Sequence, residues 1–179
     1  MTEAIFNRIV GIVESGDYGG STLRAKGLRS FPDSIDAIVK PKTAAQNAQI
    51  AVLILPRADT GWVHGSGAGW FSTTFRYDLS FYIQRAKAGN DALGIADVVN
   101  LNMLAAQIFL SRLQLQLAGQ ANIAEIAGEI TWQTTSNLAV PISYPPSNVS
   151  SGQGASLYWG FVAALTVPYR QFITFSSQG

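Results

Sequence analysis

The sequence is constrained most by a long alternation of apolar and polar residues between Phe71 and Gln84. A period of two places alternate side chains on opposite faces of a β-strand, so this segment predicts a strand with one face in the core and one in solvent. At about 3.3 Å per residue it would extend roughly 40 Å, longer than a typical strand, and we expect its far end to project from the domain. The expected core positions are Phe71, Thr73, Phe75, Tyr77, Leu79, Phe81 and Ile83, and the expected solvent positions are Ser72, Thr74, Arg76, Asp78, Ser80, Tyr82 and Gln84.

Four other segments have a clear secondary-structure signal. Residues 3–14 place isoleucines at helical spacing and predict an amphipathic helix. Residues 49–55, QIAVLIL, form a continuous apolar run that is typical of a strand covered on both faces. Apolar residues recur every three or four positions from Ala92 to Leu117, which predicts a long helix. Alternation returns from Leu157 to Val167, and Pro168 indicates an edge or a bend.

These elements predict one α+β domain over residues 1–179. Its core would be a twisted, mostly antiparallel β-sheet packed by the N-terminal helix and the one long helix. Segments rich in Gly, Pro, Ser and Asn predict extended loops at about 57–70 and 137–156. Short strands are expected within 22–46 and within 123–134.

The composition indicates that a large part of the surface is covered by other proteins. Charged residues make up 13% of the chain, about half the usual share of ~25%. Membrane insertion is not expected, because the densest apolar segment, Leu104 to Leu110, is far below the ~20 residues needed to span. Lys and Arg total 12 against 11 acidic residues, which gives no overall field for nucleic acid. The composition therefore favours an obligate oligomer.

The residues that could support catalysis do not form a recognisable set. The chain has no cysteine and a single histidine, His64, which excludes thiolate sites and histidine metal clusters. The Gly-Ser-Gly-Ala-Gly segment between Trp62 and Trp70 is followed by a strand, whereas a phosphate loop needs a following helix. We therefore expect no catalytic, cofactor or metal site, and no enzyme.

Seven residues are candidates for a subunit or partner interface. Three aromatic or imidazole side chains are expected on the glycine-rich tip before the long strand, and exposed aromatic residues on such a tip suit docking. Three apolar residues of the long helix lie on the side of its polar stripe, so that helix is expected to be covered by two surfaces. The candidates are Trp62, His64, Trp70, Leu101, Leu104, Ile108 and, in the later loop, Tyr144.

The predicted elements follow one another as an N-terminal helix, QIAVLIL, FSTTFRYDLSFYIQR, DALGIADVVNLNMLAAQIFLSRL and LYWGFVAALTVPYR. This order resembles that of bacteriophage tail terminator proteins, also called tail completion or head-tail joining proteins, over about two thirds of the chain. The resemblance implies a homo-oligomeric, hexameric ring that caps the tail tube protein and offers a surface to the head connector or neck protein. DNA would pass through the lumen without sequence readout, and the protein would belong to the virion tail or neck after assembly in the host cytoplasm. The loops at 57–70 and 137–156 depart from the compact family pattern.

Two alternatives stay open at the level of the sequence. Another neck or tail-tube structural protein would share the same broad pattern of helices and strands. A glycan- or ligand-binding module could use Trp62, Trp70, Tyr144 and Tyr158 as stacking platforms. Oligomeric state distinguishes the two classes, because a ring subunit should close with cyclic symmetry.

Overall fold

The structure is a computed structural model of the full chain, and it describes most of the predicted sheet. The described residues are 2–14, 24–39, 49–57, 61–64, 70–86, 100, 129–136, 141–146 and 154–172.

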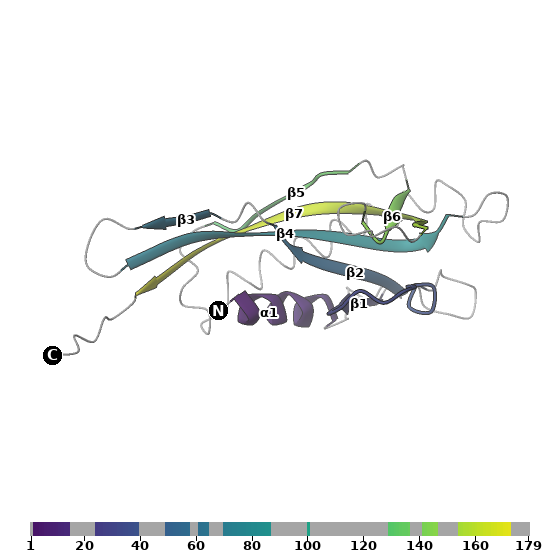
Figure 1. The fold of residues 1–179 in the computed structure, drawn as a ribbon, viewed down its shortest axis with the longest axis horizontal. Helices are drawn as coiled ribbons and strands as arrows, with labels where there is room; N and C mark the ends of the chain where they lie inside the picture. The colour runs from purple at the N-terminus through teal and green to yellow at the C-terminus, as the bar shows by residue number, and fades with distance from the viewer. Residues whose placement is uncertain are drawn as a thin grey trace.

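One helix and seven strands form the described architecture (Figure 1). The main strand order is β1-β2-β4-β7-β5, while β3 pairs with β4 and β6 pairs with β7. The sheet is mixed, because β1 runs parallel to β2 whereas the other five pairings are antiparallel. The elements are α1 (Thr2–Glu14), β1 (Arg24–Leu28), β2 (Gln49–Pro56), β3 (Gly61–His64), β4 (Trp70–Arg85), β5 (Thr131–Thr134), β6 (Ile142–Tyr144) and β7 (Ser156–Phe172).

The predicted fold class, a mostly antiparallel sheet packed by two helices, is wrong. The described chain is mainly a mixed sheet with the single 13-residue helix α1. The predicted long helix between Ala92 and Leu117 lies outside the described residues, apart from Asn100. The physical reason is the length of β4 and β7, 16 and 17 residues, which puts a large share of the chain into strand pairing. In addition, part of the second sheet face is covered by the segment 29–39 and by β6, two regions with only weak strand signals in the sequence.

Four of the predicted elements are confirmed. The predicted N-terminal helix is α1, and the apolar run QIAVLIL is β2, whose residues from Ile50 to Ile54 are buried on both faces. The long alternation is β4, although its second face is solvated only as far as Asp78, because Ser80, Tyr82 and Gln84 are buried. The last alternation is β7, which continues through Pro168 to Phe172.

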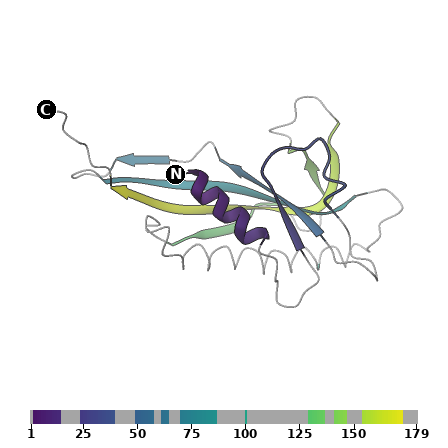
Figure 2. The same cartoon turned by 90° about the horizontal axis from the view of Figure 1, so that it is seen from below.

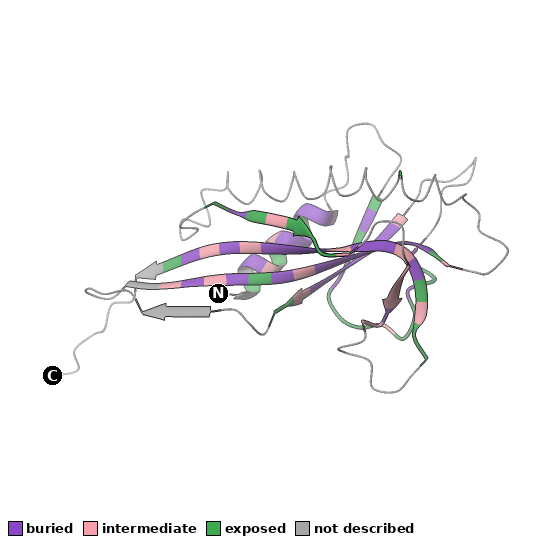
Figure 3. Ribbon diagram, turned by 90° about the horizontal axis from the view of Figure 1, so that it is seen from above, coloured by how far each residue is buried: buried purple, intermediate pink, exposed green. Residues whose placement is uncertain are grey.

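Two apolar clusters lie on opposite faces of the sheet. Figure 3 shows how the buried residues are spread along α1 and the sheet. On the first face α1 packs against β1 and β2 (Figure 2). The main cluster includes Ile9 and Val13 of α1 together with Val52, Phe81 and Phe161 of the sheet. The second cluster joins the sheet to the segment 29–39 and to β6; its buried members are Leu28, Ile35, Val39, Ala51, Leu53, Tyr82, Tyr144 and Tyr158.

A β-bulge and a glycine bring β4 and β7 close together where both sheet faces become buried. Tyr82 pairs with Gly160, and the next pair is Gln84 with Trp159, so one extra residue lies on β4. A Cβ atom on Gly160 would lie 1.8 Å from the Phe81 carbonyl oxygen. Only glycine fits this position without movement of the backbone.

We expect Gly160→Ala to lower the free energy of unfolding by about 3 kcal/mol, because the methyl group would force β4 and β7 apart. Gly11→Ala is the matched control, since a Cβ atom on that exposed residue of α1 has no neighbour within 4 Å. The control should gain up to about 1 kcal/mol from the better helix propensity of alanine. Urea unfolding followed by circular dichroism measures both, and equal stability of the two variants would contradict the close approach at Gly160.

Candidate interaction surface

One end of the sheet extends beyond α1 and β2. β2 pairs with β4 only from Tyr77 to Tyr82, whereas Trp70 to Arg76 continues past the last β2 pairing. On this extension β4 is flanked by β3 on one side and by the last part of β7 on the other (Figures 1 and 2). We call β3, Trp70–Arg76 and Val167–Phe172 the sheet arm.

The sheet arm brings together three of the predicted interface residues. Trp62 and His64 lie in β3, opposite Thr73 and Phe71, and Trp70 is the first residue of β4, opposite Phe172. The glycine-rich segment 65–69 lies outside the described residues, as do Leu101, Leu104 and Ile108. The expected tip is therefore the end of a three-stranded extension and not an isolated loop.

Tyr144, the seventh predicted interface residue, lies inside the fold. Its side chain is 2% exposed, and its hydroxyl donates to the Pro32 carbonyl at 2.7 Å. Its ring packs edge-to-face against those of Tyr82 and Tyr158, with centroids 5.3 and 6.4 Å away. We call Tyr82, Tyr144 and Tyr158 the tyrosine cluster. It fixes β6 and the segment 29–39 to the sheet, and neither Tyr144 nor Tyr158 offers an open ring face for stacking.

The polar rim of the tyrosine cluster centres on Asp36. The Tyr158 hydroxyl donates to Asp36 Oδ1 at 2.8 Å, while Arg85 bonds to Asp36 Oδ2 and to Ser156. Burial, followed by the hydrogen bond to Asp36 and its negative charge, raises the pKa of Tyr158 to about 12. Burial also raises the pKa of Tyr82 and of Tyr144 above the ordinary value of 10. Each phenol is therefore held in its neutral form.

The face of the sheet opposite α1 is polar from Ser72 to Asp78 of β4. Arg76 is exposed, and Asp78 lies 3.6 Å from the Arg57 guanidinium. On β7 the neighbouring positions are Thr166 and Arg170, which stand opposite Arg76 and Ser72. An exposed ion pair of this kind adds little stability, typically under 1 kcal/mol. This face is hence suited to contact with water or a polar partner.

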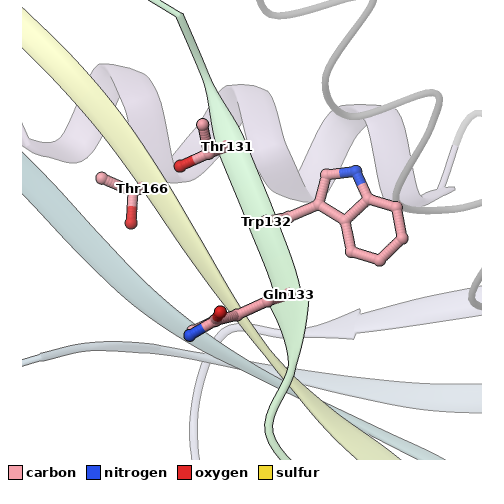
Figure 4. Close-up of a pocket in the computed structure, with 5 residues that line it drawn as sticks. Thr131, Trp132, Gln133 and Thr166 are labelled. Atoms are coloured by element: carbon pink, nitrogen blue, oxygen red, sulfur yellow. The ribbon is translucent and has the colours of Figure 1, made fainter.

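A shallow groove of about 190 Å³ lies between β5 and β7 on the same polar face. Figure 4 shows Thr131, Gln133 and Thr166 on one side of β5, with the Trp132 indole on the other. Trp132 packs against the main apolar cluster, so its ring anchors β5 while Thr131 and Gln133 stay exposed. This groove was not predicted from the sequence. Its only signal was the polar, threonine-rich composition of a short strand.

Two kinds of site are not found in the described residues. The part of the chain that the structure describes holds no group of three or more His, Asp or Glu side chains that could bind a metal ion. Within the same residues, no helix is both long and apolar enough to cross a membrane.

Comparison with known proteins gives no relative for this chain. No protein-family model matches the sequence, and no curated protein matches it significantly. The function is therefore inferred from the geometry of the chain itself.

The raised pKa values predict loss of stability in alkali. A phenol whose pKa is about 12 in the folded state and 10 in the unfolded state stabilises the fold fully below pH 10. Above pH 10 the unfolded chain releases its proton first, so the free energy of unfolding should fall as the pH rises toward 12. Tyr158→Phe should reduce the steepness of this fall, because one titrating group is removed.

Chemical denaturation at pH 9, 10 and 11 measures this slope, and absorbance at 295 nm reports phenol ionisation. Identical slopes for the wild type and Tyr158→Phe would show that Tyr158 does not titrate as the geometry requires.

Proposed function

We propose that this chain is a structural subunit of the bacteriophage head-to-tail junction. Copies assemble into a closed ring, most simply of six subunits, that caps the tail tube and joins it to the head connector. DNA passes through the lumen and is not read. The protein acts in the virion after assembly in the host cytoplasm.

The sheet arm is the observation that supports this proposal most directly. It continues β4 by seven residues beyond the last pairing with β2, a reach of about 23 Å at strand spacing. α1 makes its main contacts with β1 and β2, and the arm residues Phe75, Val167 and Tyr169 are buried in the same main apolar cluster as α1. Its outer strand β3 pairs with no described strand other than β4, so this extension fits a role in contact between subunits.

The charge content gives independent support. Only 13% of the residues are charged, about half the usual share of ~25%. Interfaces are depleted in charge at their centre, so a chain with few charged residues is better suited to protein neighbours than to a fully solvated surface.

The burial of two tyrosines argues against a glycan-binding module. Stacking requires an open aromatic face, whereas Tyr144 and Tyr158 are 2% and 1% exposed and are packed edge-to-face in the tyrosine cluster. A neck or tail-tube protein is the nearer alternative, and it differs from a terminator in the assembly that it forms.

Native mass spectrometry of the purified protein over a range of concentrations, followed by negative-stain imaging, tests the proposal. We expect a discrete species of six copies that appears as a ring with an open lumen. Open-ended tubes of stacked rings would identify a tail-tube protein instead. A monomer at every concentration, including the millimolar range, would contradict a ring subunit.

A further inference from the structure

The outer edge of β5 presents backbone groups that are unused within the described chain. β5 ends the strand order and pairs only with β7. The Thr135 N–H donates to the Val162 carbonyl at 2.8 Å, and antiparallel pairing alternates, so the backbone of Gln133 also turns toward β7. The backbone groups of Trp132 and Thr134 then point outward. No residue in the described ranges forms a hydrogen bond with them.

The other terminal strand of the main order is protected in a way that β5 is not. The Gly27 N–H of β1 donates to Glu14 Oε1 at 3.2 Å, so the end of α1 occupies this strand edge. Lys26 places its ammonium group 3.1 Å from the same carboxylate. Side-chain caps and charges are common means of preventing strand addition. β5 has the sequence Thr-Trp-Gln-Thr, with no charge and no proline.

A strand with a complementary edge lies on the opposite flank of the same sheet. β3 has four residues, as β5 has, and it pairs with β4 and with no other described strand. β3 is antiparallel to β4, β4 to β7, and β7 to β5. β3 and β5 therefore run in opposite directions, and two copies side by side present them to each other in antiparallel orientation.

The offset between the two strands agrees with a closed ring. Through β7, the residues of β5 align with Arg76–Leu79 of β4, whereas β3 aligns with Phe71–Thr74. This five-residue offset is a displacement of about 16 Å along the strands. From β3 of one copy to β3 of the next there are four strand spacings, which is about 19 Å across the strands. The ratio corresponds to a strand tilt of roughly 40°, within the range of closed β-barrels.

We propose that β5 of one copy pairs with β3 of the next copy, so that the sheet continues from subunit to subunit around the ring. The contact joins two different edges, and a head-to-tail contact of this kind repeats until the ring closes. The groove formed by Thr131, Gln133, Ala164 and Thr166, together with Trp132, adjoins the joint and accepts a small uncharged side chain of the added strand. This proposal rests on the proposed ring function and names its subunit contact.

Cysteine cross-linking tests the pairing, because the chain has no cysteine of its own. Since Gln133 turns its backbone toward β7, it would face the added strand in a non-hydrogen-bonded pair, where Cα atoms are about 4.5 Å apart and a disulfide fits. Val63 is the position to match, because it stands opposite Ser72 in the register of β3 with β4. We expect Gln133→Cys mixed with Val63→Cys to give disulfide-linked dimers on mild oxidation.

The matched control is Gln133→Cys mixed with Glu3→Cys, on the exposed face of α1, which should stay monomeric on non-reducing gels. The double variant Gln133→Cys, Val63→Cys should give a ladder up to the full ring. Dimers of Gln133→Cys alone would overturn the proposal in favour of a two-fold β5–β5 contact. No cross-link in the first mixture would overturn it as well.

A second variant blocks the edge without altering the pairing with β7. Thr134→Pro removes an outward N–H, a place where an edge strand tolerates proline, and should shift ring assembly to at least tenfold higher concentration. Thr134→Val keeps the N–H and should assemble as the wild type. Circular dichroism and thermal unfolding check that both variants fold.

The ring function and the β5–β3 contact can be overturned separately. Wild-type rings that persist in Thr134→Pro, or that give no β5–β3 cross-link, would leave the ring function standing and overturn this contact. If the wild type forms no ring, both the proposed function and this contact are overturned.

Discussion

The pairing of β4 with β7 is the interaction on which the rest of the structure depends. The two strands are joined at fifteen register positions, and the rings of Phe81 and Phe161 stack across them at 4.4 Å. Every other antiparallel strand attaches to one of these two: β2 and β3 to β4, β5 and β6 to β7. The outer edge of β4 and the outer edge of β7 are therefore each divided between two shorter strands. The two ends of the β4–β7 pair have different surroundings. One end is packed into the domain, and the other forms the sheet arm.

The bulge at Tyr82 separates these two regions. Before it, the faces of β4 alternate regularly, with Phe75, Tyr77 and Leu79 in the main cluster and Arg76 in solvent. At the bulge the backbone of β4 meets Gly160, and Tyr82 joins the tyrosine cluster on the opposite face. The sheet thus has one apolar face along its length and a second apolar face only near the bulge. Neutral phenols with raised pKa values are consistent with this second, dry cluster.

The sequence predicted those features that depend on neighbours along the chain. Alternation identified β4 and the main part of β7, the apolar run identified β2, and helical spacing identified α1. The sequence did not predict that Tyr144 is buried, because its partners Pro32 and Tyr82 are distant in the chain. It also did not predict the parallel attachment of β1 or the groove beside Thr131. Strand order and edge exposure depend on pairings between distant segments, and the local periodicity of the sequence carries no information on these pairings.

Edge protection is the feature that connects the fold with the proposed assembly. An isolated sheet gains from covering every edge, and this chain covers the β1 edge with Glu14, a residue of its only described helix. β5 has neither a charge nor a proline among its four residues, and no side chain of the described residues caps its outer edge. An uncapped edge at β5 has a physical cost, since exposed edges favour uncontrolled association. That cost is offset if the exposed edge has a defined partner that is always present during assembly. A second copy of the same chain meets this condition, because its concentration rises together with that of the edge it covers.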